Sequence, residues 1–223
     1  MAVDVIGILH RTDLFRSVPA EELTDVVSSS RLRTLRRGQI VFTTGDPGDT
    51  LIVVVSGQLK IVARSADGVE LTLAFIGPHG TLGEVSVADG GPRSADAETA
   101  TDSQLLFVPR QAVRAVCARV PAAAEVLACA IAANLRRLTE ATSDLVFLDL
   151  PRRVAKLLIS QPRRGDGVLE QQLTQTEYAR QLGSTRQSVN LAMRGFERRG
   201  WIELSDRSLT IRQPEALARF AGA

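Results

Sequence analysis

The chain has 223 residues, of which 44% are hydrophobic, and it carries a formal net charge of +2. These values are ordinary for a globular protein with one or two domains. No apolar run approaches the length needed to cross a bilayer, and no leader opens the sequence. We therefore expect a cytoplasmic protein that has no membrane role.

Cysteine and histidine are too few for the usual metal centres. Cys117 and Cys129 lie on apolar helical stretches, and we predict that both are buried small hydrophobic residues. Two cysteines cannot hold a four-cysteine iron–sulfur cluster within one chain, and His10 and His79 do not complete a metal site of usual composition. We expect no metal, no haem and no iron–sulfur cluster. No nucleophile–base pair is visible, so we do not expect an enzyme.

The first half of the chain passes from helices to short strands. Residues 1–34 are predicted to be helical, with Pro19, Glu21 and Glu22 opening a short helix. From Arg36 onward, β-branched runs alternate with glycine, aspartate and proline clusters that are typical of turns. The predicted strands are residues 39–42, 51–55, 58–63, 70–75 and 104–108. Many short strands at this spacing favour a β-sandwich or barrel of about ninety residues, flanked by helices.

A candidate binding segment follows the predicted strands, in residues 80–87 and 90–95. Its glycines permit close approach of the backbone to a ligand, and the carboxylate of Glu84 can accept a ribose hydroxyl. Arg93 with Ser94 can hold a phosphate through several charge-assisted hydrogen bonds. As residue types alone these side chains leave a second possibility open, in which Glu84 and Arg93 simply pair with each other.

A long helical stretch begins at Pro121 and reaches Leu148. Its apolar residues recur at alternating spacings of four and three, the pattern of a coiled-coil seam. The seam positions are Ile131, Leu135, Leu138, Thr142 and Leu145, of which all but Thr142 are apolar. The stripe fits either a dimer seam or an ordinary helix packed on its own domain. Asp149 with Pro151 then reads as an N-cap and a helix-starting proline, so a hinge between domains is predicted here.

Residues 174–200 have the pattern of a helix-turn-helix. Thr174 with Glu177 fits the capping box that opens a helix, and Gly183 permits the left-handed backbone with which a helix ends. Ser184 with Gln187 fits a second capping box that begins the next helix. Two short capped helices joined by a tight glycine turn form the unit that lays its second helix in the major groove of DNA.

The second helix of this motif carries hydrogen-bonding residues near its start. They are Thr185, Arg186, Gln187, Ser188 and Asn190, and such side chains contact base edges and phosphates. The side of this helix predicted to be buried is Val189, Ala192, Met193 and Phe196. Any αα-hairpin in a helical domain can show the same caps and apolar stripe. The flanking sequence must therefore distinguish a DNA-binding helix-turn-helix from an ordinary αα-hairpin.

The flanking sequence favours DNA binding. Residues 200–204 and 208–212 are β-prone runs separated by the turn-like residues 205–207, as in the wing of a winged helix, and Pro214 opens a last helix ending at Ala223. Residues 150–223 hold 13 basic and 7 acidic residues, a net charge of +6, whereas residues 1–149 hold 14 and 18, a net charge of −4. The basic excess lies where phosphate contact requires it. Because a palindromic DNA site requires a two-fold dimer, we favour the dimer seam for the long helix.

The whole chain resembles the cyclic-AMP receptor/Fnr family of bacterial transcription regulators. Gly83-Glu84 and Arg93-Ser94-Ala95 match the phosphate-binding cassette of that family. The resemblance implies an α+β fold with an N-terminal cyclic-nucleotide-binding β-roll, a long dimerisation helix and a C-terminal winged helix-turn-helix. These parts are expected at residues 1–119, 120–149 and 150–223.

The resemblance also implies roles for single residues. Glu84 would hold the ribose 2′-hydroxyl, and Arg93 with Ser94 would hold the cyclic phosphate. The full set of implied ligand-binding residues is Gly83, Glu84, Val85, Ser86, Arg93, Ser94, Leu138 and Thr139. The implied DNA-binding residues are Thr174, Ser184, Thr185, Arg186, Gln187, Ser188 and Asn190. The implied partners are a double-stranded DNA operator, a second copy of the chain and RNA polymerase.

Two departures from the family pattern concern specificity. Where cyclic-AMP-responsive members offer a threonine and then a serine or asparagine to the adenine, this chain has Leu138 and Thr139, and a leucine cannot hydrogen-bond a base. In the second helix, Gln187 replaces a glutamate and Leu191 replaces a basic residue of the members that read a TGTGA half-site. Arg186 can still make a bidentate contact to guanine, so we expect a changed operator.

These observations predict a homodimeric, ligand-responsive transcription regulator that is controlled allosterically by cyclic AMP. One alternative, motivated by Leu138, is a regulator that responds to cyclic GMP or a cyclic dinucleotide, or that binds DNA without a ligand. Another is an enzyme or a pure nucleotide-binding module with a helical appendage.

Overall fold

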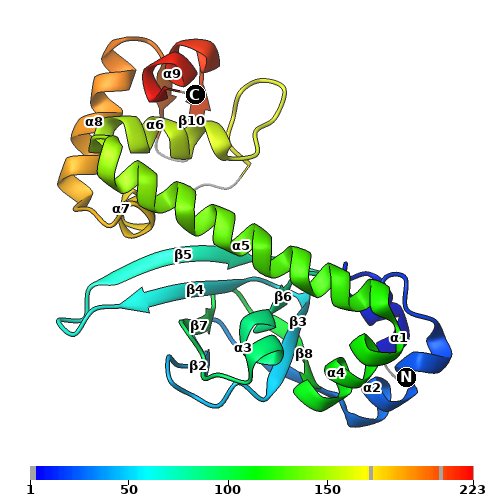
Figure 1. Cartoon of the computed structure of the whole chain (residues 1–223). Helices are drawn as coiled ribbons and strands as arrows, with labels where there is room; N and C mark the ends of the chain where they lie inside the picture. The colour runs from blue at the N-terminus through cyan, green and yellow to red at the C-terminus, as the bar shows by residue number, and fades with distance from the viewer. Residues whose placement is uncertain (1–3, 171–172, 206–207, 223) are drawn as a thin grey trace. The chain divides into compact units, whose positions relative to one another are not determined.

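The computed structural model describes residues 4–170, 173–205 and 208–222. The chain forms two compact units, and most of their helices and strands are labelled in Figure 1. The first unit comprises Met1–Gly68 and Leu73–Arg137, and the second comprises Val69–Thr72 and Leu138–Ala223. No helix of the described residues is long and apolar enough to cross a membrane.

The strands of residues 31–109 form two four-stranded sheets (Figure 1). Their strands are β1 (Arg31–Leu35), β2 (Ile40–Phe42), β3 (Thr50–Ser56), β4 (Leu59–Arg64), β5 (Glu70–Ile76), β6 (Thr81–Leu82), β7 (Asp96–Thr99) and β8 (Ser103–Pro109). One sheet has the order β1-β8-β3-β6 and the other the order β2-β7-β4-β5. The pairs β1–β8, β3–β8 and β4–β7 are antiparallel, as the predicted sandwich or barrel requires.

Strand β3 lies between two hydrophobic cores, since successive side chains of a strand point to opposite faces. Leu51 and Val53 pack into the core shared with the N-terminal helices, whereas Ile52 and Val54 pack into the core between the two sheets. All four side chains are at most 1% exposed. A strand buried on both faces is continuously apolar, and for this reason residues 51–55 could be predicted as a strand from the sequence.

Helices cover the face of the β1-β8-β3-β6 sheet that carries Leu51 and Val53. They are α1 (Val5–His10), η1 (Ala20–Leu23), α2 (Thr24–Ser29) and α4 (Arg110–Arg119), while α3 (Glu84–Asp89) lies in the connection from β6 to β7. The side chains they bury include Leu9, Leu23, Val26, Val113 and Val116. This packing anchors both ends of the β-rich segment on one core.

Three strands were not predicted from the sequence: the two-residue strand β6 and the longer strands β1 and β7. The prediction that residues 1–34 are helical is wrong from Arg31, where β1 begins and pairs with β8 so that Arg31 lies opposite Phe107. Strand β7 was also missed, and it pairs with both β2 and β4. Strands β1 and β7 are polar, and their hydrogen-bonding partners lie far away in sequence, so no local periodicity marks them.

Helix α5 (Pro121–Phe147) is continuous and agrees with the predicted long helix to within one residue. Its first turns pack on the core of the first unit through Ala123, Val126 and Leu127. Farther along, three apolar residues of the predicted seam are exposed in the single chain: Leu135 (65%), Leu138 (58%) and Leu145 (59%).

The prediction that both cysteines are buried holds only in part. Cys117 packs against the core of the first unit, and burial raises the pKa of its thiol. Cys129 is exposed, so the prediction is wrong for this residue. The physical reason is its place on α5, because Cys129 lies just beyond Leu127, where the helix leaves the core.

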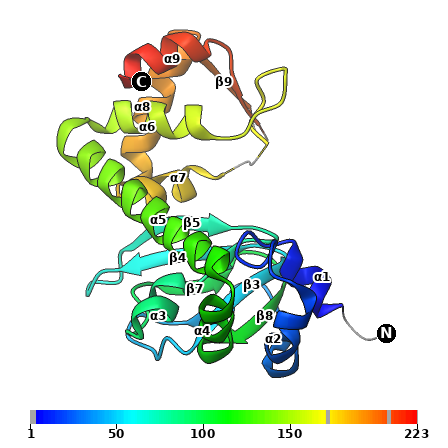
Figure 2. The same cartoon turned by 45° about the vertical axis from the view of Figure 1, so that its right-hand side comes forward.

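The second unit is helical with a small hairpin (Figure 2). After the end of α5 it contains α6 (Leu150–Ser160), α7 (Gln175–Leu182), α8 (Arg186–Arg198), β9 (Ile202–Leu204), β10 (Leu209–Ile211) and α9 (Pro214–Ala221). Asp149 caps α6 by accepting a hydrogen bond from the Arg152 N–H at 3.0 Å, which confirms the predicted start of this helix. Helix α9 begins at Pro214 as predicted but ends at Ala221, because Gly222 takes a left-handed conformation.

The predicted wing is present as an antiparallel hairpin in which Ile211 lies opposite Ile202. Residues 206–207 of its predicted turn, and Ala223, lie outside the described residues. An aromatic cluster packs between the hairpin and the helices, with the ring centroids of Phe196, Trp201 and Phe220 5.5–5.9 Å apart. The cluster joins α8, the hairpin and α9 into one core.

Candidate functional site

Arg93 is a buried charge in the first unit, with only 4% of its surface exposed. Its Nη2 donates to the carbonyl oxygen of Thr50 at 2.7 Å and to the Thr50 hydroxyl at 3.0 Å. The guanidinium carbon lies 4.3 Å from the centroid of the Phe42 ring, a cation–π arrangement. Burial lowers the pKa of this guanidinium, while the nearby carboxylates of Asp49 and Glu84 act to raise it.

The remaining donors of Arg93 are left without acceptors. Its Nε and Nη1 are buried and have no hydrogen-bond partner among the described residues. Donors of a charged group that are buried in this way cost free energy unless an acceptor completes them. A buried guanidinium with unpaired N–H donors is suited to an anion whose oxygens are strong acceptors, such as a phosphate.

Two glycines bring backbone close to this arginine. Gly83 has φ of +99°, and a Cβ at this position would lie 2.1 Å from Nη1 of Arg93. A Cβ on Gly48 would lie 2.2 Å from the Cβ of Ser86 and 2.4 Å from the Gly91 oxygen. Residues 45–49 and the segment of residues 80–95 therefore fit together only without side chains at these two positions.

Glu84 is also buried, with 8% of its surface exposed. Its carboxylate accepts a hydrogen bond from the hydroxyl of Thr81. Among the described residues it forms no ion pair with Arg93, so the simple Glu84–Arg93 pair that the sequence left open is not present. Both groups are held separately beside Gly83.

The other predicted ligand-binding residues differ in their surroundings. Ser86 is buried and donates to the Pro92 oxygen at 3.2 Å, whereas Val85 is 40% exposed and Ser94 is exposed. Leu138 and Thr139 belong to the part of α5 that is assigned to the second unit. Thr50, Phe42 and Gly48 complete the surroundings of Arg93, and no sequence signal pointed to them because they lie more than forty residues before it.

The predicted turn of the helix-turn-helix is present in the second unit. Thr174 and Glu177 form the full capping box, with the Glu177 N–H donating to the Thr174 hydroxyl at 3.2 Å and the Thr174 N–H donating to the Glu177 carboxylate at 2.6 Å. Gly183 ends α7 in a left-handed conformation, with φ of 58°. Arg153 on α6 donates to the carbonyl oxygen of Leu182 at 3.0 Å and so supports the end of α7.

The predicted second capping box, Ser184 with Gln187, is wrong by one residue. Thr185 is the N-cap of α8, and its hydroxyl accepts from the Ser188 N–H at 3.2 Å. The N–H of Ser184 instead donates to the Ala179 oxygen at 3.0 Å. Ser184 therefore closes α7, and the next helix can begin only after it.

The two faces of α8 agree with the predicted division. Val189, Ala192, Met193 and Phe196 are buried, whereas Thr185, Arg186, Gln187, Ser188 and Leu191 are exposed. Asn190 is half-buried, and its amide nitrogen donates to the Gln175 side-chain oxygen at 2.6 Å. Gln175 was not predicted as a site residue, although its place directly after the N-cap of α7 turns it toward α8. The exposed set presents a guanidinium, an amide and two hydroxyls at the start of one helix.

Within the described residues, no group of three or more histidine, cysteine, aspartate or glutamate side chains could hold a metal ion.

Comparison with known proteins finds a matching family model for each unit. The family model "Cyclic nucleotide-binding domain" matches residues 32–120, and "Crp-like helix-turn-helix domain" matches residues 152–220. The CRP-like cAMP-activated global transcriptional regulator of Mycobacterium tuberculosis is 37% identical, over 96% of this chain and 98% of its own. The cyclic AMP receptor protein of Thermus thermophilus is 31% identical, over 93% and 96%.

This chain belongs to the Crp/Fnr family of transcription regulators. The fold agrees with that of a mutant of CooA from Carboxydothermus hydrogenoformans, with a TM-score of 0.79 over 94% of this chain and 96% of the other, at 22% identity. Membership confirms the α+β architecture expected from the sequence, with its β-rich nucleotide-binding domain, long helix and winged helix-turn-helix. As a member of the Crp/Fnr family, the protein is a DNA-binding transcription regulator and not an enzyme.

Proposed function

We propose that this Crp/Fnr regulator is activated by cyclic AMP, which binds at residues 80–95. The observation that carries the proposal is Arg93, a buried guanidinium whose Nε and Nη1 lack acceptors among the described residues. The equatorial oxygens of a cyclic phosphate supply two acceptors of the right charge. Relatives at 37% and 31% identity are named for their response to or reception of cAMP, which supports the choice of nucleotide.

The neighbouring residues take complementary roles in the proposal. The carboxylate of Glu84 is buried beside Gly83 and accepts the ribose 2′-hydroxyl, and the hydroxyl of Ser94 adds a donor to the phosphate. Backbone groups of residues 83–86 border the phosphate, since Gly83 keeps that space free of a Cβ. Leu138 and Thr139 of α5 contact the base.

We further propose that three segments of the chain have different functions. Residues 1–119 bind the ligand, residues 120–149 join two copies through α5, and residues 150–223 bind an operator. The exposed leucines of α5 support the dimer, and a two-fold dimer presents two recognition helices about one turn of DNA apart. We place the protein in the cytoplasm, with RNA polymerase as the partner through which it acts on transcription.

Titration calorimetry with cyclic AMP and cyclic GMP tests which nucleotide the protein binds. Wild-type protein is expected to bind cyclic AMP, and Arg93→Gln is expected to weaken binding by at least about tenfold, because hydrogen bonds to a charged group contribute about 1.5–3 kcal/mol. Arg11→Gln removes the charge of an exposed arginine in the same unit and serves as the control. Absence of heat with either nucleotide at millimolar concentration would contradict the proposal.

A second candidate is a regulator that binds DNA without cyclic AMP or responds to another ligand, such as cyclic GMP or a cyclic dinucleotide. Leu138 favours it, because its exposed side chain on α5 cannot donate to or accept from a base. This second candidate is supported if Arg93→Gln and wild type bind the same operator equally well, both with and without nucleotide.

A further inference from the structure

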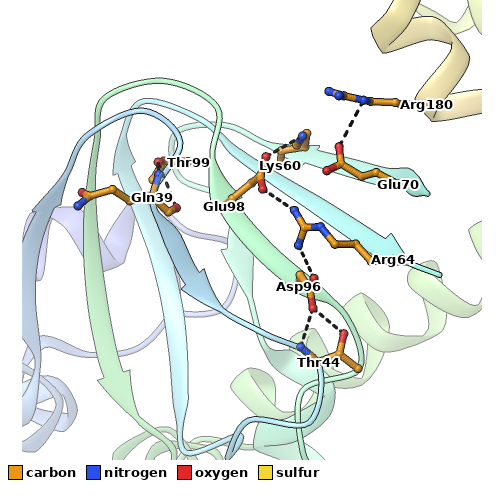
Figure 3. Close-up of polar contacts among 9 residues, drawn as sticks. All are labelled: Gln39, Thr44, Lys60, Arg64, Glu70, Asp96, Glu98, Thr99 and Arg180. Carbon is orange, nitrogen blue, oxygen red and sulfur yellow. Dashed lines mark hydrogen bonds and ion pairs between the residues drawn. The ribbon is translucent and has the colours of Figure 1, made fainter. Parts of the chain in front are cut away.

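A row of charged side chains crosses strands β4 and β7 of the first unit (Figure 3). Lys60 lies directly opposite Glu98, and Val62 lies opposite Asp96, so these residues share one face of the sheet with Arg64. Arg64 donates to both carboxylates, to Asp96 through Nη1 and to Glu98 through Nη2 at 2.7 Å. Lys60 completes the row with a 2.7 Å ion pair to Glu98.

Asp96 differs from Glu98 because it has a second set of partners outside the two strands. Its Oδ1 accepts from the backbone N–H of Thr44 at 2.7 Å and from the Thr44 hydroxyl at 2.8 Å (Figure 3). The carboxylate is buried, with 8% of the residue exposed. The Thr44 N–H and, to a smaller extent, Arg64 hold the pKa of Asp96 below its ordinary value, so the group is an anion at neutral pH.

The loop that carries Thr44 is itself bonded to Arg93. The Gly45 N–H donates to the Arg93 oxygen at 2.9 Å, and the Arg93 N–H donates to the Asp46 oxygen at 2.9 Å. The Thr43 N–H donates to the Asp46 carboxylate at 2.8 Å and closes the loop. Both backbone hydrogen-bonding groups of Arg93 are therefore used on residues 45–46, one residue away from the point where Asp96 holds the loop.

Arg93 is thus fixed at two ends. Thr50 holds the tip of its side chain, and residues 45–46 hold its backbone. A group that must meet an anion with two N–H donors needs a geometry correct to about half an ångström, which depends on supporting hydrogen bonds. Asp96 supplies that support through Thr44 without touching the guanidinium itself.

We propose that Asp96 is a positioning residue for the anion site, acting with Thr44 to set the backbone of Arg93 and Ser94. The proposal rests on the proposed function, since it takes the cyclic phosphate as the anion. In the alternative hypothesis, Asp96 only joins β4 to β7 and contributes to the stability of the fold. Glu98 distinguishes the two interpretations. It forms ion pairs with the same strand β4, but among the described residues it has no interaction with residues 43–46.

Cyclic AMP affinity, measured by calorimetry, tests the role. Asp96→Asn is expected to weaken binding by about tenfold, as loss of an outer-shell partner does at metal sites, because the amide keeps the size but loses the charge that orders Thr44. Glu98→Gln is the matched control, with affinity expected to stay within about twofold of wild type. Thr44→Val removes the hydroxyl and keeps the N–H, so a loss between the two is expected. Thermal unfolding followed by circular dichroism checks that Asp96→Asn and Glu98→Gln are equally folded.

A double-mutant cycle supplies a readout that a purely structural role would not move. In the Arg93→Gln background, Asp96→Asn is expected to change cyclic AMP affinity by less than about twofold, because the group that it positions is gone. An equal, additive loss in both backgrounds would overturn the proposal, and so would wild-type affinity in Asp96→Asn. If wild-type protein binds no cyclic nucleotide, the proposed function fails first; if it binds and Asp96→Asn binds equally, only the positioning role fails.

Discussion

The two arginines proposed to contact a phosphate and a base have opposite surroundings. Arg93 is buried and held by Thr50, so its desolvation is supplied by the fold itself. Arg186 is exposed at the first position of α8 and keeps its hydration until it meets a partner. A pre-ordered buried charge suits one small anion, whereas an exposed guanidinium suits a base edge that changes along DNA.

Arg186 should determine base preference more than total affinity. Arg186→Ala is expected to abolish the preference for the operator over random DNA while retaining weak non-specific binding, a loss of about 1–3 kcal/mol of discrimination. Competition gel shifts with cognate and random duplexes measure the change, and Arg219→Ala, another exposed arginine of the second unit, is the control.

An equal loss of affinity for all DNA sequences would contradict base reading by Arg186. In that case Arg186 is a phosphate contact, and its removal should also lower the slope of log affinity against log salt concentration by about 1.

At the scale of elements, short-range hydrogen bonds determine where the helices of the DNA-binding unit begin and end. Thr174 with Glu177 opens α7, Thr185 opens α8, and Asp149 opens α6. Between α7 and α8, only Gly183 has a left-handed backbone, and this single residue sets the direction of the recognition helix. The geometry of DNA reading thus depends on one backbone conformation.

Gly183→Ala should therefore destabilise the second unit selectively. A side chain in the left-handed conformation costs about 1–2 kcal/mol, so the unfolding midpoint of this unit should fall. Trp201 is the only tryptophan of the chain and lies in the core of this unit, so its fluorescence during urea unfolding reports the change.

Gly165→Ala is the control for this experiment. The backbone of Gly165 is not left-handed, and a Cβ there would meet nothing within 4 Å. Equal midpoints for the two variants would indicate that the turn tolerates a side chain.

At the scale of the whole molecule, charge and apolar surface are distributed unevenly along the chain. The net charge is −4 over residues 1–149 and +6 over residues 150–223. Long helix α5 lies at the end of the first of these regions in sequence and exposes Leu135, Leu138 and Leu145. An apolar stripe of this length on a monomer is expected to be covered by a second copy, which also doubles the number of DNA contacts.

Replacing two of these leucines should separate the copies. Leu135→Glu with Leu145→Glu is expected to convert a dimer into a monomer and to weaken operator binding, because the two half-sites are then no longer bound together. Size-exclusion chromatography with light scattering gives the mass. Ile40→Glu, an equally exposed apolar residue on β2, should leave the mass unchanged. A dimer that survives both substitutions would place the interface elsewhere.

Features that depend on neighbours a few residues apart could be predicted from the amino-acid sequence. The capping box of Thr174, the N-cap of Asp149 and the left-handed Gly183 were all predictable, since each is a contact within four residues. The doubly buried strand at residues 51–55 was also predictable from its continuous apolar run. The Ser184 cap failed because two adjacent hydroxyl residues could begin α8, and the hydrogen bond from Ser184 back to Ala179 selected Thr185.

Features that join distant segments of the chain could be recognised only in the folded structure. Strand β1 was missed because its partner β8 lies about seventy residues away, and pairing of polar strands leaves no local period. The sequence marked Arg93 and Glu84 as candidates but left open whether they pair. Folding brought Thr50, Phe42 and residues 45–46 around Arg93 and left two of its donors without acceptors, because long-range packing, and not sequence spacing, determines which buried groups find partners.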